Sequence, residues 1–176
     1  MTEIRIRSAH TADLDAAVLK AARSLLDDVF EGGFSDDDWD HALGGMHVLA
    51  WQGDALVGHA AVVQRRLTTR GRALRTGYVE AVGVRDDLQG RGIGAALMAE
   101  VERLVRGGYE LGALCASEEA IDFYLGRGWQ RWSGPNSALM PDGPEATDEE
   151  VFVLPVAPGL VPEGPLACDF RNGDVW

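Results

Sequence analysis

Apolar and polar positions alternate in the first stretches of the chain that predict strands. The N-terminal MTEIRIRS alternates around Ile4 and Ile6, which is typical of a half-buried strand. Two longer apolar stretches, Met46 to Trp51 and Ala55 to Leu67, flank Gln52-Gly53-Asp54. A short turn rich in Gly and Asp between two such stretches predicts a β-hairpin.

A helical period separates the first strand from this hairpin. We expect Thr11 to cap a helix, because its hydroxyl can accept a hydrogen bond from a main-chain N–H of the first turn. Gly32-Gly33 is expected to end this helix, because glycine tolerates the left-handed conformation that often follows the last turn. The apolar face of this helix consists of Leu14, Val18, Leu25 and Val29. A second, shorter helix is expected to open at Ser35 and to close at Gly44-Gly45.

The stretch that starts at Gly77 changes from a strand pattern to a helix pattern. Its β-forming residues are Tyr78, Val79, Val82 and Val84, and its helically spaced residues are Ile93, Leu97, Val101 and Leu104. Asp86 and Asp87 interrupt the strand. Between the two patterns lies a turn with glycine at every second position, Gly90, Gly92 and Gly94. The sequence therefore predicts a strand, a glycine turn and a helix in succession.

This glycine turn is suited to an anion such as a pyrophosphate. Missing side chains let a ligand approach the main chain, and the first N–H groups of a helix have no partner within it. A P-loop is excluded, because it requires Gly-Lys-Ser/Thr and the only lysine is Lys20. A Rossmann dinucleotide site is disfavoured by the mid-chain position and the G-x-G-x-G spacing. A helix-entry turn without a ligand is the other reading of the glycines alone.

The remaining elements complete an α/β fold. The helix is expected to continue to Arg106, Leu111 to Ala116 to form a strand, Ser117 to Gly126 a helix capped by its first residue, and Val151 to Leu154 a last strand. This order predicts a central mixed, mostly antiparallel β-sheet flanked by helices on both faces, in one domain over residues 1–176. Pro155 to Pro165, with four prolines, is expected to be a covering tail.

The composition is that of a domain with its own core. The 176 residues are 46% hydrophobic, and no apolar run approaches the length of a membrane span. The N-terminus does not resemble a secretion signal, so we expect a cytoplasmic protein. Cys115 and Cys168 form no C-x-x-C motif, and no histidines pair at ligand spacing. Neither a disulfide framework nor a metal site is therefore expected.

Acidic residues outnumber basic ones, 28 to 16, which gives a net charge of -12. This charge disfavours nucleic acid as a partner. Acidity alone can serve solubility, whereas clustered carboxylates can draw a cationic substrate into a cleft. The clusters are Asp36, Asp37, Asp38 and Asp40, then Asp148, Glu149 and Glu150, and finally Asp169 with Asp174.

Two motifs resemble those of the GCN5-related N-acetyltransferase (GNAT) family. Gln89, Gly92 and Gly94 match its coenzyme A signature, Gln/Arg-x-x-Gly-x-Gly/Ala, and Ala120 to Trp129 matches a later helix with a Tyr-x-x-x-Gly-aromatic ending. The resemblance implies the GNAT fold and acetyl-CoA as co-substrate. It places the coenzyme at Val82, Gly83, Val84, Gln89, Gly90, Arg91, Gly92, Ile93, Gly94 and Ala95.

Acetyl transfer to an amine needs a proton acceptor for the amine and a proton donor for the leaving thiolate. Glu80 is the candidate base, and strand alternation predicts that it shares a face with Val82 and Val84. Tyr124 is the candidate acid, since a phenol with a pKa of about 10 suits a thiolate. Outside the family pattern, Glu80 would be read as solvent-facing and Tyr124 as core. Cys115 has no positive neighbour in sequence to activate it, so direct transfer is expected.

Longer matches narrow the resemblance to the aminoglycoside 2′-N-acetyltransferases. They are Phe34 to Asp38, Leu43 to His47, Ala61 to Arg65, Gly77 to Glu80, Leu111 to Leu114 and Cys168 to Trp176. The resemblance implies a homodimer that acetylates the 2′-amine of polycationic aminoglycosides and so confers resistance to them. It places substrate contacts at Asp38, Glu80, Ala81, Cys115, Glu149, Glu150, Asp174 and the terminal carboxylate of Trp176.

Two other functions stay open at this point. An acetyltransferase of the same fold could act on another small polyamine or on a cell-wall amine. A non-catalytic domain that binds coenzyme A would need neither a base at Glu80 nor a phenol at Tyr124, and both are present.

Overall fold

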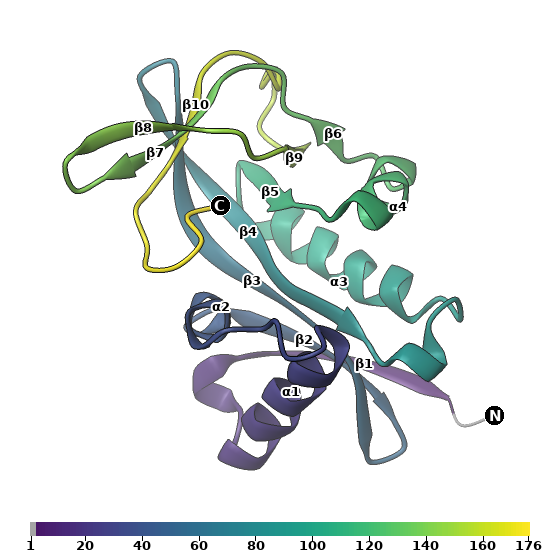
Figure 1. The fold of residues 1–176 in the computed structure, drawn as a ribbon. Helices are drawn as coiled ribbons and strands as arrows, with labels where there is room; N and C mark the ends of the chain where they lie inside the picture. Colours follow the sequence, from purple (N-terminus) through teal and green to yellow (C-terminus); the bar gives the residue numbers. More distant parts are fainter. Residues whose placement is uncertain (1–2) are drawn as a thin grey trace. The chain divides into compact units, whose positions relative to one another are not determined.

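The computed structural model describes residues 3–176, and contacts among them divide the chain into two units. The first unit contains the chain up to residue 63 and residues 79–104, and the second contains residues 64–78 and 105–176. Two long strands, β3 (Ala55–Thr69) and β4 (Arg72–Val84), are drawn in Figure 1, and each contributes residues to both units. Met1 and Thr2 of the predicted first strand lie outside the described residues. The single domain predicted from the sequence therefore stays a prediction.

The first unit holds the N-terminal strands and the longer helices. Its elements are β1 (Ile4–His10), η1 (Thr11–Asp13), α1 (Ala16–Val29), α2 (Asp36–Ala42), β2 (Met46–Gln52), η2 (Asp86–Leu88), most of α3 (Ile93–Gly108), and parts of β3 and β4. Strand β2 pairs antiparallel with β1 on one side and with β3 on the other, which confirms the predicted hairpin. In that hairpin His47 lies opposite Ala61, and Leu49 lies opposite His59.

Helices cover both faces of the β2–β3 pair. The indole ring of Trp39 on α2 packs against the rings of His47 and His59, with centroid distances of 6.1 and 6.3 Å. The adjacent Gly58 faces α3 instead, because a Cβ atom there would lie 3.0 Å from Cδ1 of Leu97. Neighbouring strand residues point to opposite faces, so α2 and α3 lie on opposite sides. The predicted class, a mixed α/β fold with helices on both faces of a sheet, is confirmed.

Two predicted helix caps are wrong. Thr11 opens the short turn η1, and α1 is capped by the carboxylate of Asp15, which accepts from the Val18 N–H at 2.9 Å. Ser117 makes no side-chain cap, and the helix predicted from it is divided into η3 (Glu118–Ala120) and α4 (Ile121–Gly126). Ser35 does cap α2 as predicted. These errors move element boundaries by a few residues and leave the element order intact.

The second unit holds the C-terminal strands. They are β5 (Leu111–Cys115), β6 (Gln130–Arg131), β7 (Asn136–Met140), β8 (Gly143–Thr147), β9 (Val151–Pro155) and β10 (Leu166–Cys168). With its parts of β3 and β4, the strand order is β6-β9-β5-β4-β3-β10-β7-β8. Strand β4 runs parallel to β5, and β7 parallel to β10. Strand β9 pairs antiparallel with both β5 and β6, and β8 pairs antiparallel with β7.

The sequence patterns missed four short strands and one turn of this unit. Strands β6, β7, β8 and β10 are two to five residues long, too short to establish a clear alternation. Strand β4 starts five residues earlier than predicted, after a tight turn in which Arg70 and Gly71 have φ angles of 49° and 75°. Positive φ at both central residues is the geometry of a two-residue hairpin turn. The arginine at a position that favours Asn or Gly hid this turn from the sequence analysis.

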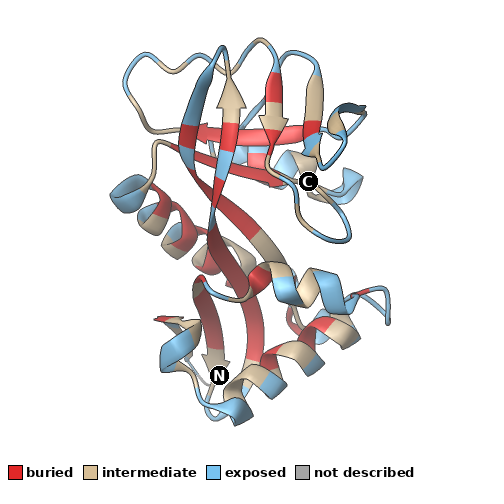
Figure 2. Cartoon of the chain, turned by 90° about the vertical axis from the view of Figure 1, so that its left-hand side faces the viewer, coloured by how far each residue is buried: buried red, intermediate tan, exposed pale blue. Residues whose placement is uncertain are grey.

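Buried residues gather along the strands and along one side of the helices, while the loops are largely exposed (Figure 2). The core of the first unit includes Leu26, Leu49 and Leu97. That of the second includes Trp129 and Phe152. Within residues 3–176, no helix combines the length and the apolar character needed to cross a membrane.

A buried arginine fastens the C-terminal segment of the second unit, residues 169–176. Arg65 is only 4% exposed, and its guanidinium pairs with the Asp169 carboxylate at 2.8 Å. It also donates to the main-chain oxygens of Asp169 at 2.9 Å and Val175 at 2.7 Å, and lies 4.6 Å from the ring centroid of Tyr78. Because a buried charge is costly unless it is paired, Arg65 and this segment depend on each other.

We therefore expect Arg65→Met to lower the free energy of unfolding by roughly 2–3 kcal/mol and to speed proteolysis within residues 169–176. Arg70→Met is the matched control. Arg70 pairs with Glu163 at 3.4 Å, and both side chains are about 60% exposed, so its loss should cost less than about 1 kcal/mol. Urea unfolding of both variants measures the difference. Equal losses would contradict a fastening role for Arg65.

Candidate active site

The predicted strand, turn and helix occur in the first unit as β4, η2 and α3. Hydrogen bonds stabilise the turn between the strand and the helix. The Leu88 N–H donates to the Arg85 carbonyl at 2.9 Å, and the side-chain amide of Gln89 donates to the Val84 carbonyl at 3.2 Å. The same amide donates to the Asp86 carboxylate at 2.9 Å. The side chain of Gln89, a residue of the predicted coenzyme signature, thus fixes the turn itself.

The glycines of this turn leave main-chain groups accessible. Gly90 and Gly92 are exposed and have φ angles of 72° and 82°, a conformation that favours glycine. A Cβ atom at either residue would meet nothing within 4 Å, so open space adjoins the backbone. The helical ladder begins where the Ala96 N–H donates to the Gly92 carbonyl at 3.0 Å, so the preceding N–H groups have no acceptor inside α3. This arrangement fits the pyrophosphate of a coenzyme.

Strand β4 contains a strained residue next to the candidate base. Ala81 follows Glu80 and has a φ angle of 51°, in the left-handed region that residues with a Cβ avoid at a cost of about 1–3 kcal/mol. This conformation interrupts the regular alternation from which Glu80 was predicted to share a face with Val82 and Val84, and that premise of the prediction is therefore wrong. Gly83 faces α1, because a Cβ atom there would lie 3.2 Å from Cγ1 of Val29.

A chain of two buried histidines ends at this strained residue. Nδ1 of His59 lies 2.8 Å from the Ala81 carbonyl oxygen, and Nε2 of His59 lies 2.9 Å from Nδ1 of His47. Nε2 of His47 is in turn 2.8 Å from the Thr11 hydroxyl. Both rings are fully buried, and burial lowers the pKa of each to about 4. Both histidines are therefore neutral at neutral pH.

The candidate acid lies in the second unit. Tyr124 is buried on α4, with its ring edge-on to the rings of Phe123 and Trp129 at centroid distances of 5.2 and 6.2 Å. Burial raises the pKa of Tyr124 to about 12, so the phenol is protonated at neutral pH. A phenol with this pKa is a weaker acid than the sequence analysis assumed, and it serves better as a hydrogen-bond donor to a thiolate than as a full proton donor.

Several predicted substrate contacts also lie in the second unit. The Trp176 indole N–H donates to the Thr147 hydroxyl at 2.7 Å, and its main-chain N–H donates to the Asp174 carboxylate at 3.1 Å. Arg171 donates to the main-chain oxygen of Trp176 at 2.7 Å. These bonds bring Asp174 and Trp176 to the end of β8, two residues before Glu149. On β5, Cys115 Sγ accepts from the Tyr78 hydroxyl at 3.5 Å.

Arginines already engage part of each acidic cluster. Asp36 pairs with Arg23 at 3.0 Å, Asp169 pairs with Arg65, and Glu150 pairs with Arg131. Asp38 has a local task, because its carboxylate accepts from the Ser35 N–H and hydroxyl, both at 2.8 Å, in the capping box of α2. The Ser-x-x-Asp spacing in the sequence is itself the signature of such a capping box. Substrate roles for Asp38 and Glu150 stay predictions.

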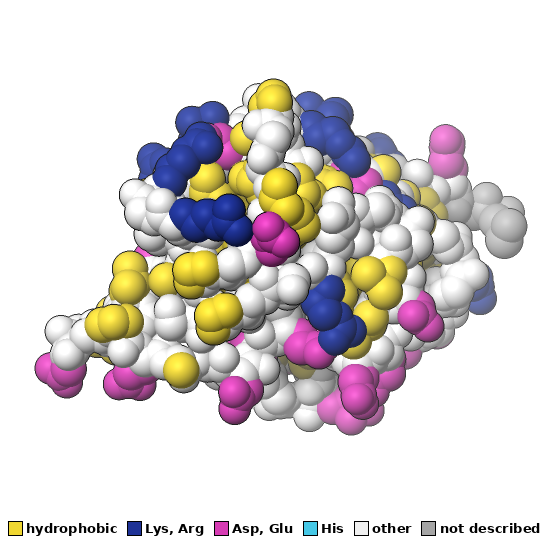
Figure 3. Space-filling view, turned by 90° about the horizontal axis from the view of Figure 1, so that it is seen from above, with side chains coloured by type: hydrophobic (Ala, Val, Ile, Leu, Met, Phe, Trp, Pro, Cys, Tyr) yellow, Lys and Arg dark blue, Asp and Glu magenta, His cyan; other side chains and the backbone are white. Residues whose placement is uncertain are grey.

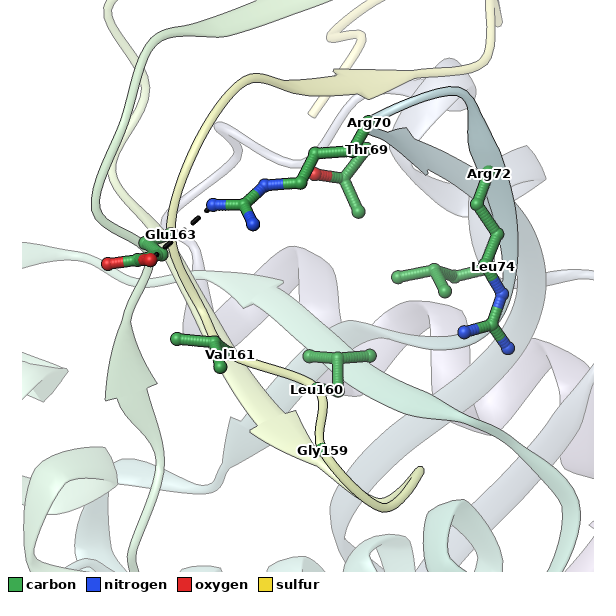
Figure 4. A pocket seen from close by; sticks show the side chains of 8 residues that line it. All are labelled: Thr69, Arg70, Arg72, Leu74, Gly159, Leu160, Val161 and Glu163. Atoms are coloured by element: carbon green, nitrogen blue, oxygen red, sulfur yellow. Dashed lines mark hydrogen bonds and ion pairs between the residues drawn. The ribbon is translucent and has the colours of Figure 1, made fainter.

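A separate cavity of about 240 Å³ lies at the β3–β4 turn of the second unit and contains no predicted site residue. Arg70 reaches across it to Glu163, and Leu74, Leu160 and Val161 line its apolar side (Figure 4). Lys and Arg side chains also gather beside apolar ones on one face of the molecule (Figure 3). Among residues 3–176, no group of three or more His, Cys, Asp or Glu residues is placed to hold a metal ion.

Comparison with known proteins decides the family. The family model for the acetyltransferase (GNAT) domain matches residues 5–132. This chain belongs to the GNAT acetyltransferase family. A curated relative, the aminoglycoside 2′-N-acetyltransferase of Mycolicibacterium fortuitum, is 51% identical over 180 aligned positions, which cover 97% of this chain and 91% of the relative.

Solved structures share the fold at low sequence identity. A GNAT family acetyltransferase from Brucella melitensis, solved in complex with acetyl-CoA, has a TM-score of 0.67 at 17% identity, with 98% of each chain covered. Escherichia coli ElaA has a TM-score of 0.64 at 21% identity and covers 86% of this chain and 99% of its own. The resemblance to the GNAT family that the sequence motifs indicated is thereby confirmed.

Sequence reasoning found the glycine turn before α3 and missed the histidine chain. In the first unit, the predicted coenzyme residues Gln89 to Ala95 form the glycine turn and the first residues of α3, and Glu80 to Val84 lie on the preceding strand. It places Cys115, Tyr124, Glu149, Glu150, Asp174 and Trp176 in the second unit. His47 and His59 were passed over, although the hairpin register places them diagonally on one face.

The histidine pair predicts a loss of stability in acid. The pKa of each histidine is about 4 in the folded protein and 6.5 in the unfolded chain, so the unfolded state binds more protons between these values. The contribution of the two histidines to the free energy of unfolding should therefore be complete above pH 6.5. It should fall as the pH approaches 4, by up to about 1.4 kcal/mol per pH unit for each proton taken up. Urea unfolding at about pH 7 and about pH 5 measures this slope.

A His59→Gln variant is the reference for that measurement, because nearby carboxylates titrate identically in both proteins. The parent protein should lose more stability than the variant between the two pH values. Equal slopes would show that the histidines are not buried in neutral form.

Proposed function

We propose that this GNAT enzyme transfers the acetyl group of acetyl-CoA to the 2′-amino group of an aminoglycoside. The 51% identity with the Mycolicibacterium fortuitum enzyme over nearly the whole of both chains carries the proposal. The abundance of carboxylates supports it independently, because aminoglycosides carry several ammonium groups. In a cell exposed to these drugs, the reaction would confer resistance.

The coenzyme would be held by the main chain at the start of α3. The N–H groups between Gly90 and Ala95 would bind its pyrophosphate, favoured by the positive end of the helix dipole. Main-chain groups of Val82, Gly83 and Val84 would line the arm that carries the thioester. Acetyl-CoA, when bound, supplies an activated acyl group, and this chain supplies binding and proton acceptance.

Glu80 would act as the general base in a direct transfer. The attacking amine loses a proton to Glu80, directly or through a water molecule, as the new N–C bond forms and the C–S bond breaks. Tyr124 would donate a hydrogen bond to the departing sulfur. Cys115 accepts a bond from Tyr78, and no cation adjoins it in sequence, so an acetyl-cysteine intermediate is not part of this proposal.

The substrate's ammonium groups would meet carboxylates that arginines do not already occupy in this structure. Asp38 in the first unit and Glu149 and Asp174 in the second are the best candidates. Ala81 and Cys115 are further proposed contacts, and Glu150 would be reached by displacing Arg131. The terminal carboxylate of Trp176 already accepts from Arg171, so an ammonium group would have to compete with that arginine for it. The proposal includes a homodimer, which the family resemblance implies. Light scattering would test this by measuring the molar mass of the protein in solution.

Product analysis tests the function. The protein is incubated with acetyl-CoA and with aminoglycosides that carry a 2′-amine or a 2′-hydroxyl, and the products are analysed by mass spectrometry with fragmentation. We expect a single acetyl group on the 2′-nitrogen and no product from the 2′-hydroxyl compounds. Acetylation at another nitrogen, or of simple polyamines alone, would replace the aminoglycoside proposal with one of the other amine substrates.

The same assay tests Glu80. Glu80→Gln keeps the size of the side chain and removes the proton acceptor, so kcat should fall by about 100-fold or more with little change in acetyl-CoA binding. The remaining activity should rise with pH, because a substrate amine that deprotonates in solution no longer needs a base. A kcat within about threefold of the parent would remove Glu80 from the proposal.

The coenzyme site can be tested with a matched pair of glycines. Gly92→Ala places a methyl group beside the proposed pyrophosphate site and should weaken acetyl-CoA binding about tenfold or more. Gly32→Ala is the control, because Gly32 has nearly the same φ angle, 80° against 82°, and also faces open space, yet it lies after α1. Both variants carry the same backbone strain. Calorimetric titration with acetyl-CoA should separate them, and equal affinities would contradict the site.

A further inference from the structure

The direction of each bond in the histidine chain follows from its last acceptor. A carbonyl oxygen only accepts, so Nδ1 of His59 carries the hydrogen that binds the Ala81 oxygen. The Nε2 atom of a neutral ring is then bare, and it accepts from Nδ1 of His47. By the same reasoning, Nε2 of His47 accepts from the Thr11 hydroxyl.

The other end of the chain is closed by the backbone. Thr11 Oγ1 accepts from the Gly44 N–H at 2.9 Å, which leaves its own hydrogen for His47 at 2.8 Å in preference to the Gly45 carbonyl at 3.3 Å. Every donor and acceptor is thereby satisfied with both rings neutral. The chain thus has one consistent arrangement of hydrogens, and it delivers a donor to a single main-chain oxygen, that of Ala81.

The backbone conformation at Ala81 is unusual for its place in the fold. Among residues 3–176, three non-glycine residues have positive φ, and two of them, Glu31 and Arg70, lie in turns. Ala81 alone lies within a strand, between the candidate base and the strand segment proposed to line the coenzyme. Such strain persists only where surrounding contacts hold it, and it is concentrated at functional sites.

We propose that His59, oriented by His47, is a positioning residue for acetyl transfer. Its hydrogen bond to the Ala81 carbonyl keeps the backbone of Ala81 in the left-handed conformation. It thereby sets the orientation of the two peptide groups that join Ala81 to Glu80 and to Val82. If the bond is lost, Ala81 relaxes towards the extended conformation and both peptide groups turn. The inference rests on the proposed reaction at β4, and it does not depend on which amine is acetylated.

A rescue experiment separates this role from a general contribution to packing. His59→Leu removes the donor and should lower kcat about tenfold or more, while the affinity for acetyl-CoA changes less than about threefold. Adding Ala81→Gly should restore a large part of kcat, because glycine adopts positive φ without a held carbonyl. Adding Ala60→Gly is the matched control, since Ala60 is a buried residue of β3 without positive φ, and it should restore nothing.

A conservative variant adds a second comparison. His59→Asn places an amide N–H near the position of Nδ1, so it should retain more of the parent kcat than His59→Leu. Kinetics are measured with whichever amine the parent protein acetylates, so a failure of the aminoglycoside proposal does not affect this test. A folded His59→Leu variant with kcat within twofold of the parent would overturn the inference, and so would equal rescue by Ala60→Gly.

Nuclear magnetic resonance of the parent protein tests the chain even where His59→Leu does not fold. With ¹⁵N-labelled histidine, both buried rings should show the neutral form with hydrogen on Nδ1 at about pH 7, and neither should titrate near 6.5. An Nε2–H form at His59 would overturn the inference, because that ring could not donate to the Ala81 carbonyl through Nδ1.

Discussion

The candidate site of the first unit depends on backbone conformations that most residues avoid. Gly90 and Gly92 adopt positive φ in the turn before α3, and Ala81 does so within β4. The glycines reach this conformation at little cost and leave the main chain open to solvent, whereas Ala81 needs contacts that hold it. The proposed binding of the coenzyme on this stretch would therefore rely on main-chain groups, and the side chains of Gln89 and His59 each bond to a main-chain oxygen of β4.

In the second unit, a charged side chain holds the backbone of the C-terminal segment, residues 169–176, in place. The Arg65 guanidinium is buried, and its partners include main-chain oxygens of the C-terminal segment as well as the Asp169 carboxylate. A guanidinium has several donors in a fixed plane, so it can order a segment that has no regular secondary structure. Tyr78 supports this arrangement, since the guanidinium groups of Arg65 and Arg171 lie 4.6 and 5.3 Å from its ring centroid. Asp174 and Trp176, two of the proposed substrate contacts, thus lie in a segment to which both arginines donate hydrogen bonds.

The predictions from sequence succeeded where one local pattern carried one physical meaning. The glycine turn, the β2–β3 hairpin and the Ser35 cap each follow from a few neighbouring residues, and the structure contains all three. The same approach failed at Ala81, because alanine in a strand pattern carries no sign of positive φ. It failed again at His47 and His59, whose pairing requires the hairpin register, and at Arg65, whose partners lie about a hundred residues away. Long-range contacts of this kind leave no local periodicity to read.

Charge pairing changes what the acidic composition means for a substrate. The net charge of -12 acts at long range and would raise the concentration of a polycation near the protein, whichever carboxylates are paired. Recognition at short range is different, because an ammonium group that binds Asp36, Glu150 or Asp169 would compete with an arginine. For Asp169 that exchange would also leave the buried Arg65 without its carboxylate, which is the more costly loss. Discrimination among amines should therefore fall to carboxylates such as Asp38, Glu149 and Asp174, while the paired residues contribute to attraction and to stability.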